Sequence, residues 1–97
     1  MRVEYAPRAA RDLQEIGSYY RTAANERVAA AVAQRIEHVV NLIARQPNIA
    51  PLVPRRANVH VALVLRYPYK IFYRVRGDAV QILHIRHTAR RPWTPEF

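Results

Sequence analysis

The sequence contains no cysteine, two glycines and a single serine. Without cysteine the chain forms no disulfide bond and no thiolate metal site, and it is compatible with a reducing compartment. Two glycines, Gly17 and Gly77, cannot build the glycine-rich loop that holds the phosphates of a bound nucleotide. Ser18, the only serine, has no nucleophile-elbow pattern around it, which argues against a Ser-His-Asp hydrolase.

Long hydrophobic runs are missing as well. The chain begins Met1-Arg2-Val3-Glu4-Tyr5, which has no apolar leader segment, and no stretch approaches the length of a membrane span. We therefore expect a cytoplasmic protein without membrane contact. Its 97 residues, of which 51% are hydrophobic, predict one domain over residues 1–97 with its own core.

Acidic residues are scarce. Seven Asp and Glu stand against sixteen Lys and Arg, so the net charge is +9 at pH 7. Lys70 is the only lysine among these cations. Arginine is suited to bidentate contact with phosphate and carboxylate, so we expect a polyanion or an acidic protein as partner. A GC-rich genome would also favour arginine over lysine, but it does not explain the net charge.

The first half of the chain predicts a short strand followed by two helices. Residues 2–6 alternate apolar and polar side chains, and Pro7 suits the first turn of a helix over about residues 8–21. Asn25 is placed to cap a second helix that runs to about Arg45. The apolar stripes are Leu13, Ile16 and Tyr20 in the first helix, with Asp12 and Glu15 elsewhere on the wheel, and Val28, Val32, Ile36, Val39 and Ile43 in the second.

The second half predicts a loop and three strands. Residues 47–54 hold three prolines, and alternating patterns follow at residues 59–65, 69–75 and 80–86. Gly77 in the turn between the last two strands allows a positive φ. The predicted fold is α+β: an N-terminal strand at a sheet edge, a helical hairpin on one face, and a three-stranded antiparallel meander.

Strand alternation places the histidines of the last strand. In a regular strand, one face would carry Val80, Ile82, His84 and Arg86, and the other Gln81, Leu83, Ile85 and His87. His84 and His87 should then point to opposite sides of the sheet. We interpret His84 as a buried strand residue that bonds a neighbour. His87, at the strand end, is either a polar cap or an acid or base active near neutrality.

Candidate chemistry is limited to cations and histidines. The histidines lack metal-ligand spacing and acids are few, so we predict no metal and no cofactor. Metal-independent RNA cleavage needs a base, an acid and cations, which His87, Arg86, Arg90, Arg91, Arg66 and Lys70 could supply. The consecutive Arg90 and Arg91 are either an anion contact or a solvated charge run. Trp93 is either a ring packed over the sheet edge or a stacking platform.

The segment PYKIFYRVRGDAVQILHIRHTARRPW, preceded by ARDLQEIGSYY and a long second helix, resembles the ParE/RelE superfamily of bacterial toxins from toxin–antitoxin systems. The resemblance covers nearly the whole chain and is weakest over residues 46–58. It implies the fold predicted above. It also implies a cognate antitoxin, ParD-like or RelB-like, whose acidic amphipathic C-terminal segment wraps the toxin in a hetero-oligomer.

Two activities divide the superfamily. RelE-like toxins cleave mRNA on the ribosome with several lysines and arginines and a C-terminal tyrosine or histidine, whereas ParE-like toxins poison DNA gyrase. This chain has one lysine, and RRPWTPEF ends it without tyrosine, while HTARR is similar to the segment that closes many ParE-like sequences. The resemblance therefore favours a non-catalytic gyrase inhibitor.

Under that hypothesis the predicted target or antitoxin contacts are Arg66, Lys70, Arg86, Arg90, Arg91 and Trp93. Two alternatives stay open. One is a RelE-like ribosome-dependent endoribonuclease with His87, Arg90 and Arg91 as catalytic residues. The other is a non-toxic remnant that only binds an antitoxin.

Overall fold

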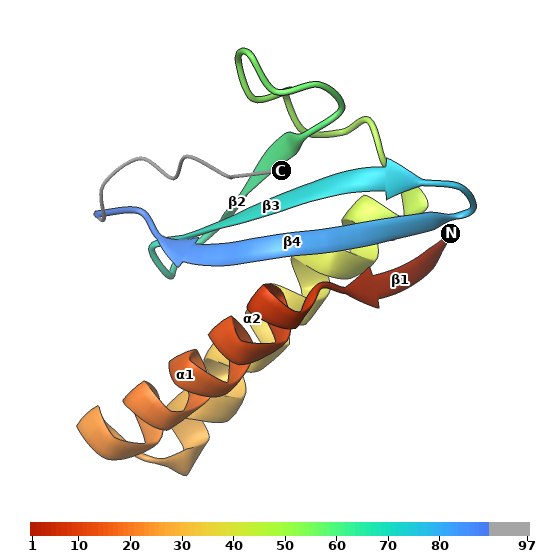
Figure 1. Ribbon diagram of the computed structural model, residues 1–97. Helices are drawn as coiled ribbons and strands as arrows, with labels where there is room; N and C mark the ends of the chain where they lie inside the picture. Colours follow the sequence, from red (N-terminus) through yellow and green to blue (C-terminus); the bar gives the residue numbers. More distant parts are fainter. Residues whose placement is uncertain (90–97) are drawn as a thin grey trace.

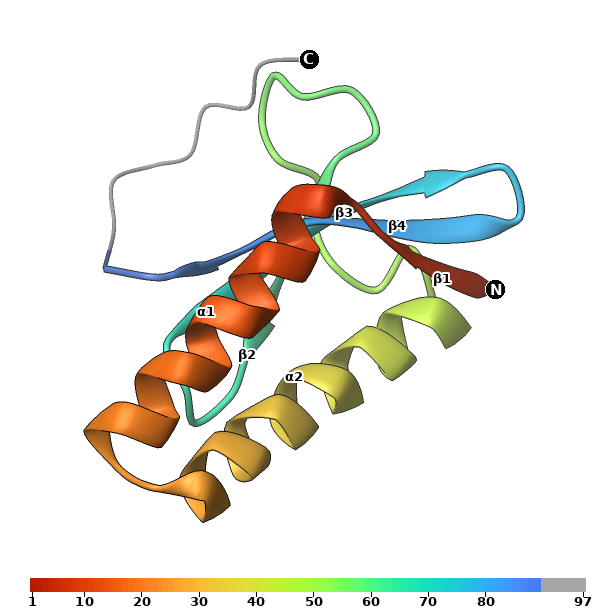
Figure 2. The same ribbon diagram turned by 60° about the horizontal axis from the view of Figure 1, so that its bottom comes forward.

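Two helices lie against one face of a four-stranded sheet (Figure 1). The computed structural model describes residues 1–89. Its elements are β1 (Arg2–Tyr5), α1 (Pro7–Ala23), α2 (Glu26–Arg45), β2 (His60–Val64), β3 (Tyr69–Arg76) and β4 (Ala79–His87). The predicted α+β class and the order of elements are confirmed. Figure 2 shows α1 and α2 side by side and antiparallel, on the same side of the strands.

The strand order in the sheet is β1-β4-β3-β2. β2, β3 and β4 form the predicted antiparallel meander, and Gly77, with φ 61°, lies in the tight turn between β3 and β4. β1 pairs in parallel with β4 over Ala79–Ile82, so the N-terminal strand occupies an edge as expected. The opposite edge of the sheet is β2.

Both helix starts follow their sequence signals. Pro7 takes the first position of α1, where its missing N–H is not needed. The Asn25 side chain accepts a hydrogen bond of 2.9 Å from the Val28 N–H and caps α2. The buried stripe of α2 passes through Val40, with Val39 half-buried beside it. This stripe holds α2 against the sheet.

The main core lies between the helices and the sheet. Its largest fully buried side chains include Tyr73, Ile36, Ile71 and Ile82. The Tyr73 hydroxyl donates a 2.7 Å hydrogen bond to the Pro47 carbonyl, so this buried polar group is satisfied. A second, smaller cluster lies on the outer face of the sheet; it consists of Val59, Phe72 and Leu83, with Val53 and Val61 packed on it. Part of the proline-rich loop therefore covers the face that the helices leave free.

β4 contains a bulge that the sequence pattern did not predict. Phe72 on β3 pairs with His84, but the next residue, Tyr73, pairs with Ile82. Leu83 is therefore an extra residue between two ladder positions. A bulge of this kind reverses the inside-outside alternation of the strand beyond it.

The predicted alternation of the last strand is consequently wrong after the bulge. Val80, Ile82 and Ile85 all belong to the core beneath the helices, although Ile85 was expected on the other face from Val80. His84 and His87 do lie on opposite faces, as predicted, because both follow the bulge and are three positions apart, an odd step in an alternating strand.

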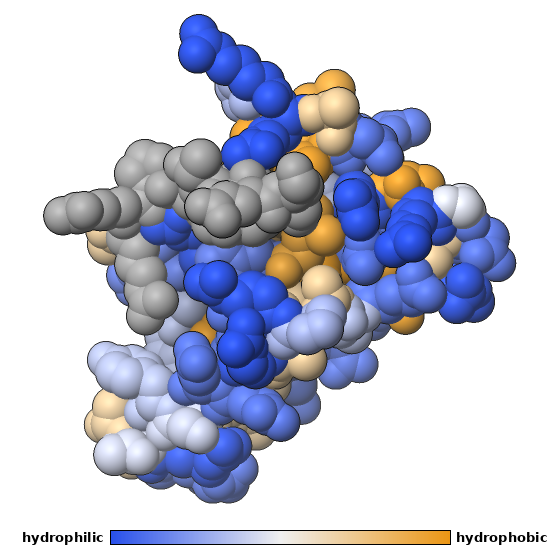
Figure 3. Space-filling model, viewed as in Figure 1, coloured by the Kyte–Doolittle hydropathy of each residue, from blue (hydrophilic) through white to orange (hydrophobic). Residues whose placement is uncertain are grey.

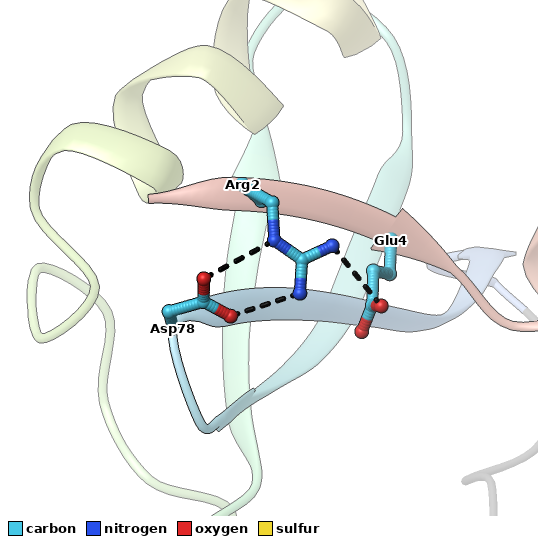
Figure 4. A network of polar contacts seen from close by, with 3 residues as sticks. All are labelled: Arg2, Glu4 and Asp78. Carbon is cyan, nitrogen blue, oxygen red and sulfur yellow. Dashed lines mark hydrogen bonds and ion pairs between the residues drawn. The ribbon is translucent and has the colours of Figure 1, made fainter.

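The edge strand β1 is tied to the turn between β3 and β4 by an ion-pair network (Figure 4). Arg2 Nε and Nη2 donate to the two carboxylate oxygens of Asp78 at 3.3 and 2.8 Å, and Glu4 lies 3.5 Å from Arg2 Nη1. These groups are exposed, so the network fixes geometry more than it adds stability. Among residues 1–89, no helix has both the length and the apolar character needed to cross a membrane.

Candidate functional site

Cationic side chains gather on the outer face of the sheet, near the end of β4. Lys70 and Arg86 are direct cross-strand neighbours on β3 and β4. Their sequence neighbours Ile71 and Ile85 point into the core, so Lys70 and Arg86 point away from the helices. Arg66 is exposed in the turn that leads into β3. The structure thus brings Lys70 and Arg86 together and places Arg66 at the same end of the sheet.

This face combines charge with an apolar centre. In the space-filling view, hydrophobic surface gathers over the strands and hydrophilic side chains surround it (Figure 3). Arg74 lies on the same face of β3 and donates a 2.8 Å hydrogen bond from its Nε to Gln81 on β4. The arrangement suits contact with a partner that presents both apolar and acidic groups.

His87 lies on the other face of the sheet. Its ring meets the ring of Tyr69 edge to face, with centroids 5.6 Å apart, and its Nδ1 accepts a 3.1 Å hydrogen bond from the Ala89 N–H. The pocket beside His87 has a volume of about 360 Å³; its lining includes Glu15, Tyr19, Tyr20, Tyr69 and Arg86.

The candidate residues for RNA cleavage therefore do not all share one surface: Arg86 lines the same pocket as His87, but Lys70 does not. His87 faces the helices and Lys70 faces away from them. Acid–base cleavage needs its groups within hydrogen-bond reach of one phosphodiester. Arg90, Arg91 and Trp93 lie outside the described residues, so their roles stay predictions. A catalytic role for His87 stays a prediction that depends on that arginine pair.

A buried pair of polar side chains joins α1 to β4. His84 Nδ1 lies 2.6 Å from Asp12 Oδ2, and the Ile85 backbone N–H donates to the same oxygen at 2.9 Å. Arg8 Nε lies 3.5 Å from the other carboxylate oxygen. The Asp12 and His84 side chains are almost fully buried. The interpretation of His84 as a buried strand residue bonded to a neighbour agrees with this geometry.

Asp12 was not expected among the buried residues, because the helical wheel places it away from the apolar stripe of α1. The residue shares the buried side of the helix with Ala9, three positions earlier. β1 pairs with β4 only as far as Ile82, so the N–H of Ile85 at this edge needs another acceptor. Asp12 is that acceptor. The only sequence signal for the burial of Asp12 was its position three residues after Ala9, which places both residues on the same side of the helix.

The Asp12 carboxylate is stabilised in its ionised form. Burial raises the pKa of Asp12, but hydrogen bonds from His84 and Ile85, with the charges of His84 and Arg8, outweigh it. The net effect holds the pKa of Asp12 below its ordinary value of 3.8.

We expect Asp12 to make the fold acid-sensitive. A lowered folded-state pKa gives stability that is present above the ordinary carboxyl pKa and is lost as the pH falls through the folded pKa. Urea unfolding of the wild type and of Asp12→Asn between about pH 5 and pH 2 measures this. The free-energy difference between the two proteins should shrink as the pH falls. A difference that is constant over this range would contradict the expectation.

The second concave surface is a groove along β2. It lies between β2 and α2, has a volume of about 550 Å³ and is lined mostly by apolar atoms. We call it the edge groove. Its lining consists of Arg35, His38, Val39, Leu42, Ile43, Ile49, Ala50, Pro51, Val61, Ala62, Leu63, Leu65 and Lys70. Of the predicted contact residues, Lys70 is thus shared between this groove and the basic outer face.

The described residues contain no group of three metal-ligating side chains. His60 is buried, stacks on Tyr73 with ring centroids 4.9 Å apart, and lies with Nδ1 2.8 Å from the Ala50 carbonyl. That contact anchors the loop before β2 to the core.

Comparison with known proteins gives one family match. The model of a family described as "ParE toxin of type II toxin-antitoxin system, parDE" matches residues 3–92. No curated protein matches the chain. Among solved structures, the chromosomal ParDE system from P. aeruginosa is similar with a TM-score of 0.78 and 26% identity, over 90% of this chain and 95% of that one.

Two other solved structures are similar to this chain. One is the RelBE2 toxin–antitoxin complex of Mycobacterium tuberculosis, with a TM-score of 0.61 and 26% identity over 92% of each chain. The other is the isolated E. coli RelE toxin, with a TM-score of 0.70 and 13% identity, over 93% of this chain and 86% of that one. At 13% identity, this second match concerns the fold alone.

Proposed function

Since the chain belongs to the ParE toxin family of type II toxin–antitoxin systems, we propose that it is a toxin that poisons DNA gyrase by binding it. The observation that carries this proposal is the family match over residues 3–92. The positions of the candidate residues for RNA cleavage also support a binding toxin, because His87 and Lys70 lie on opposite faces of the sheet. A binding toxin needs no such assembled set.

The proposal includes a cognate antitoxin that neutralises the toxin in a hetero-oligomer. The solved structures similar to this chain include a ParDE system and a RelBE2 toxin–antitoxin complex. The net charge of +9 favours an acidic partner, and complementary charge speeds association and adds specificity. Lys70 and Arg86 supply part of that charge on the outer face.

A gyrase supercoiling assay tests the proposal, run beside cleavage of ribosome-bound mRNA with the same purified protein. We expect supercoiling to be inhibited and the mRNA to stay intact. Cleaved mRNA with active gyrase would replace the proposal with a RelE-like endoribonuclease. If both assays are negative and cells grow normally when the chain is produced without antitoxin, the chain is a non-toxic remnant.

Charge reversal of Arg90 and Arg91 to glutamate should reduce gyrase inhibition about tenfold. The expectation comes from the sequence, because two adjacent arginines beyond the last strand suit contact with a target. The melting temperature should change little, since surface substitutions usually have small effects on stability. Dose–response curves for supercoiling and thermal melts measure the two effects.

Arg55 and Arg56 provide the matched control for that variant, because they also form a consecutive arginine pair, in the loop before β2. Reversal of their charges changes the net charge equally. If this control loses gyrase inhibition to the same degree, only total charge matters and a specific role for Arg90 and Arg91 is wrong. A collapsed melting temperature in the Arg90 and Arg91 variant would also contradict the prediction.

A further inference from the structure

The pocket beside His87 lies on the helix side of the sheet, between α1 and the end at which Tyr69 of β3 pairs with His87 of β4. Its volume is about 360 Å³. Aromatic rings line it from two sides: Tyr19 and Tyr20 come from α1, and Tyr69 and His87 come from the sheet. We call it the tyrosine pocket. None of the described residues lines both this pocket and the edge groove, so it is a separate concave surface.

The rings of this pocket meet edge to face, one after another. The ring centroids of Tyr19 and Tyr20 are 5.0 Å apart, those of Tyr20 and Tyr69 6.5 Å, and those of Tyr69 and His87 5.6 Å. The angles between the ring planes are 85°, 67° and 84°. Because neighbouring rings are steeply inclined, their electron-rich faces point in different directions. This arrangement is similar to the aromatic cages with which proteins bind organic cations.

Two carboxylates add negative charge beside the rings. Glu15 lies one turn before Tyr19 on α1, so the two side chains are neighbours on the helix surface. Glu15 is exposed, and its carboxylate has no hydrogen bond or ion pair among the described residues. Asp12 also lines the pocket, but its carboxylate already accepts the Ile85 N–H. The Glu15 carboxylate is therefore available to a ligand.

The pocket is acidic although the chain is strongly basic. Arg86 is the one arginine or lysine among its described lining residues, and the register places its side chain on the outer face beside Lys70. The net charge of the chain is +9, so an acidic partner such as the antitoxin finds complementary charge elsewhere on the surface. The tyrosine pocket instead suits a positively charged group of another protein.

The chemistry of the pocket favours a guanidinium group. A guanidinium is planar, stacks on aromatic faces and pairs with a carboxylate through two parallel hydrogen bonds. The hydroxyl oxygens of Tyr20 and Tyr69, 3.5 Å apart, provide further acceptors for its N–H groups. A nucleobase also stacks on aromatic rings, but Glu15 and Asp12 would repel the phosphate attached to it.

We propose that the tyrosine pocket binds an arginine side chain of the toxin's protein target, with the guanidinium stacked on the ring faces and paired with Glu15. The proposal rests on the proposed function, in which the toxin acts by binding its target. An arginine held in this way fixes the orientation of the target on the helix side of the toxin, because stacking and bidentate pairing both restrict the guanidinium.

A small arginine compound tests the pocket without the target. N-acetyl-arginine amide, added to the full chain, should shift the NMR signals of the Tyr19 and His87 rings. N-acetyl-citrulline amide has nearly the same shape without the charge and should bind much more weakly. Glu15→Gln should raise the Kd of the arginine compound about fivefold, because it removes the paired charge. Glu26→Gln is the matched control and should leave the Kd unchanged, since Glu26 is also exposed and does not line the pocket.

The same substitutions should act on the target. Glu15→Gln should weaken the inhibition of supercoiling about fivefold, whereas Glu26→Gln should inhibit like the wild type. Neither change should shift the melting temperature, because both residues are exposed. Tyr19→Leu should weaken inhibition more than Tyr19→Phe, because phenylalanine keeps a ring face and leucine keeps only apolar volume.

Several results would contradict the proposal, and each has its own meaning. If the wild type inhibits gyrase but does not bind the arginine compound, the pocket assignment is wrong while the proposed function stands. Tighter binding of adenosine monophosphate than of the arginine compound would identify a nucleic acid as the ligand. If a variant with both Arg90→Gln and Arg91→Gln binds the arginine compound more tightly than the wild type, the chain's own arginines compete for the pocket.

Two further results concern the partner. If Glu15→Gln weakens antitoxin binding and leaves the inhibition of supercoiling unchanged, the arginine belongs to the antitoxin and the assignment to the target is wrong. A wild type that leaves gyrase fully active would overturn the proposed function, and the assignment to the target with it, even where the arginine compound binds.

Discussion

Replacement of Asp12 by alanine is expected to lower the free energy of unfolding by about 3 kcal/mol. The reason is that the change removes the buried carboxylate that contacts both His84 Nδ1 and the Ile85 N–H. Removing one partner of a buried polar pair costs more than the pair contributes, because the remaining group stays desolvated. Urea unfolding at neutral pH, analysed as a two-state transition, measures the loss.

Two variants separate this explanation from a general effect on α1. Asp12→Asn keeps an acceptor oxygen and should lose less stability than Asp12→Ala. Glu15→Ala removes an exposed acid from the same helix and should change the free energy of unfolding by less than about 0.5 kcal/mol. If Asp12→Ala unfolds at the same urea concentration as the wild type, the hydrogen bonds of Asp12 do not hold α1 to β4.

Much of the fold could be predicted because its signals are local. Asn25 caps α2 within one turn, Pro7 starts α1, and Gly77 permits the turn between β3 and β4. Each of these signals involves residues that are neighbours in sequence. The periodicity of apolar residues then predicts which face of each helix or strand is buried. The family resemblance then agreed with the arrangement that these elements adopt.

The features that the sequence did not predict depend on contacts between distant segments. The bulge at Leu83 changes the face of every residue after it, yet no glycine or other local signal marks it. In the sequence, Asp12 has the pattern of an ordinary polar helix residue. Its role depends on the Ile85 N–H, which β4 places beside it in the folded chain. The bulge and the Ile85 N–H both lie just beyond the last residue of β4 that pairs with β1, and the end of that pairing is a property of the assembled sheet.

Some residues of the candidate site could be predicted from the sequence, but their arrangement in space could not. Lys70 and Arg86 were expected contact residues, and the register places them side by side on the outer face. The edge groove was not expected, because Leu63 and Leu65 read as ordinary members of an alternating strand. They are exposed because β2 is the edge strand of the sheet, and the spacing of apolar residues within a strand does not predict strand order.

Two isoleucines should separate stability from partner binding. Ile71 is fully buried in the middle of β3, between Ala62 and Ile85 on the neighbouring strands. Ile71→Ala should lower the free energy of unfolding by about 4 kcal/mol, because it removes buried methylene groups and leaves a cavity in the core. The affinity of the folded fraction for the antitoxin should be unchanged, since Ile71 does not line the edge groove.

Ile49→Ala is the same substitution at a position that is 54% exposed and lines the groove. It should change the free energy of unfolding by less than about 0.5 kcal/mol. It should weaken antitoxin binding about tenfold, because exposed apolar surface of this kind is expected to be covered by a partner. Urea unfolding gives the free energy of unfolding of each variant, and calorimetric titration gives its affinity for the antitoxin. An antitoxin that binds the folded toxin also stabilises it by mass action, so the melting temperature of Ile71→Ala should rise in the complex. Equal losses of stability in both variants would contradict the division between core and binding surface.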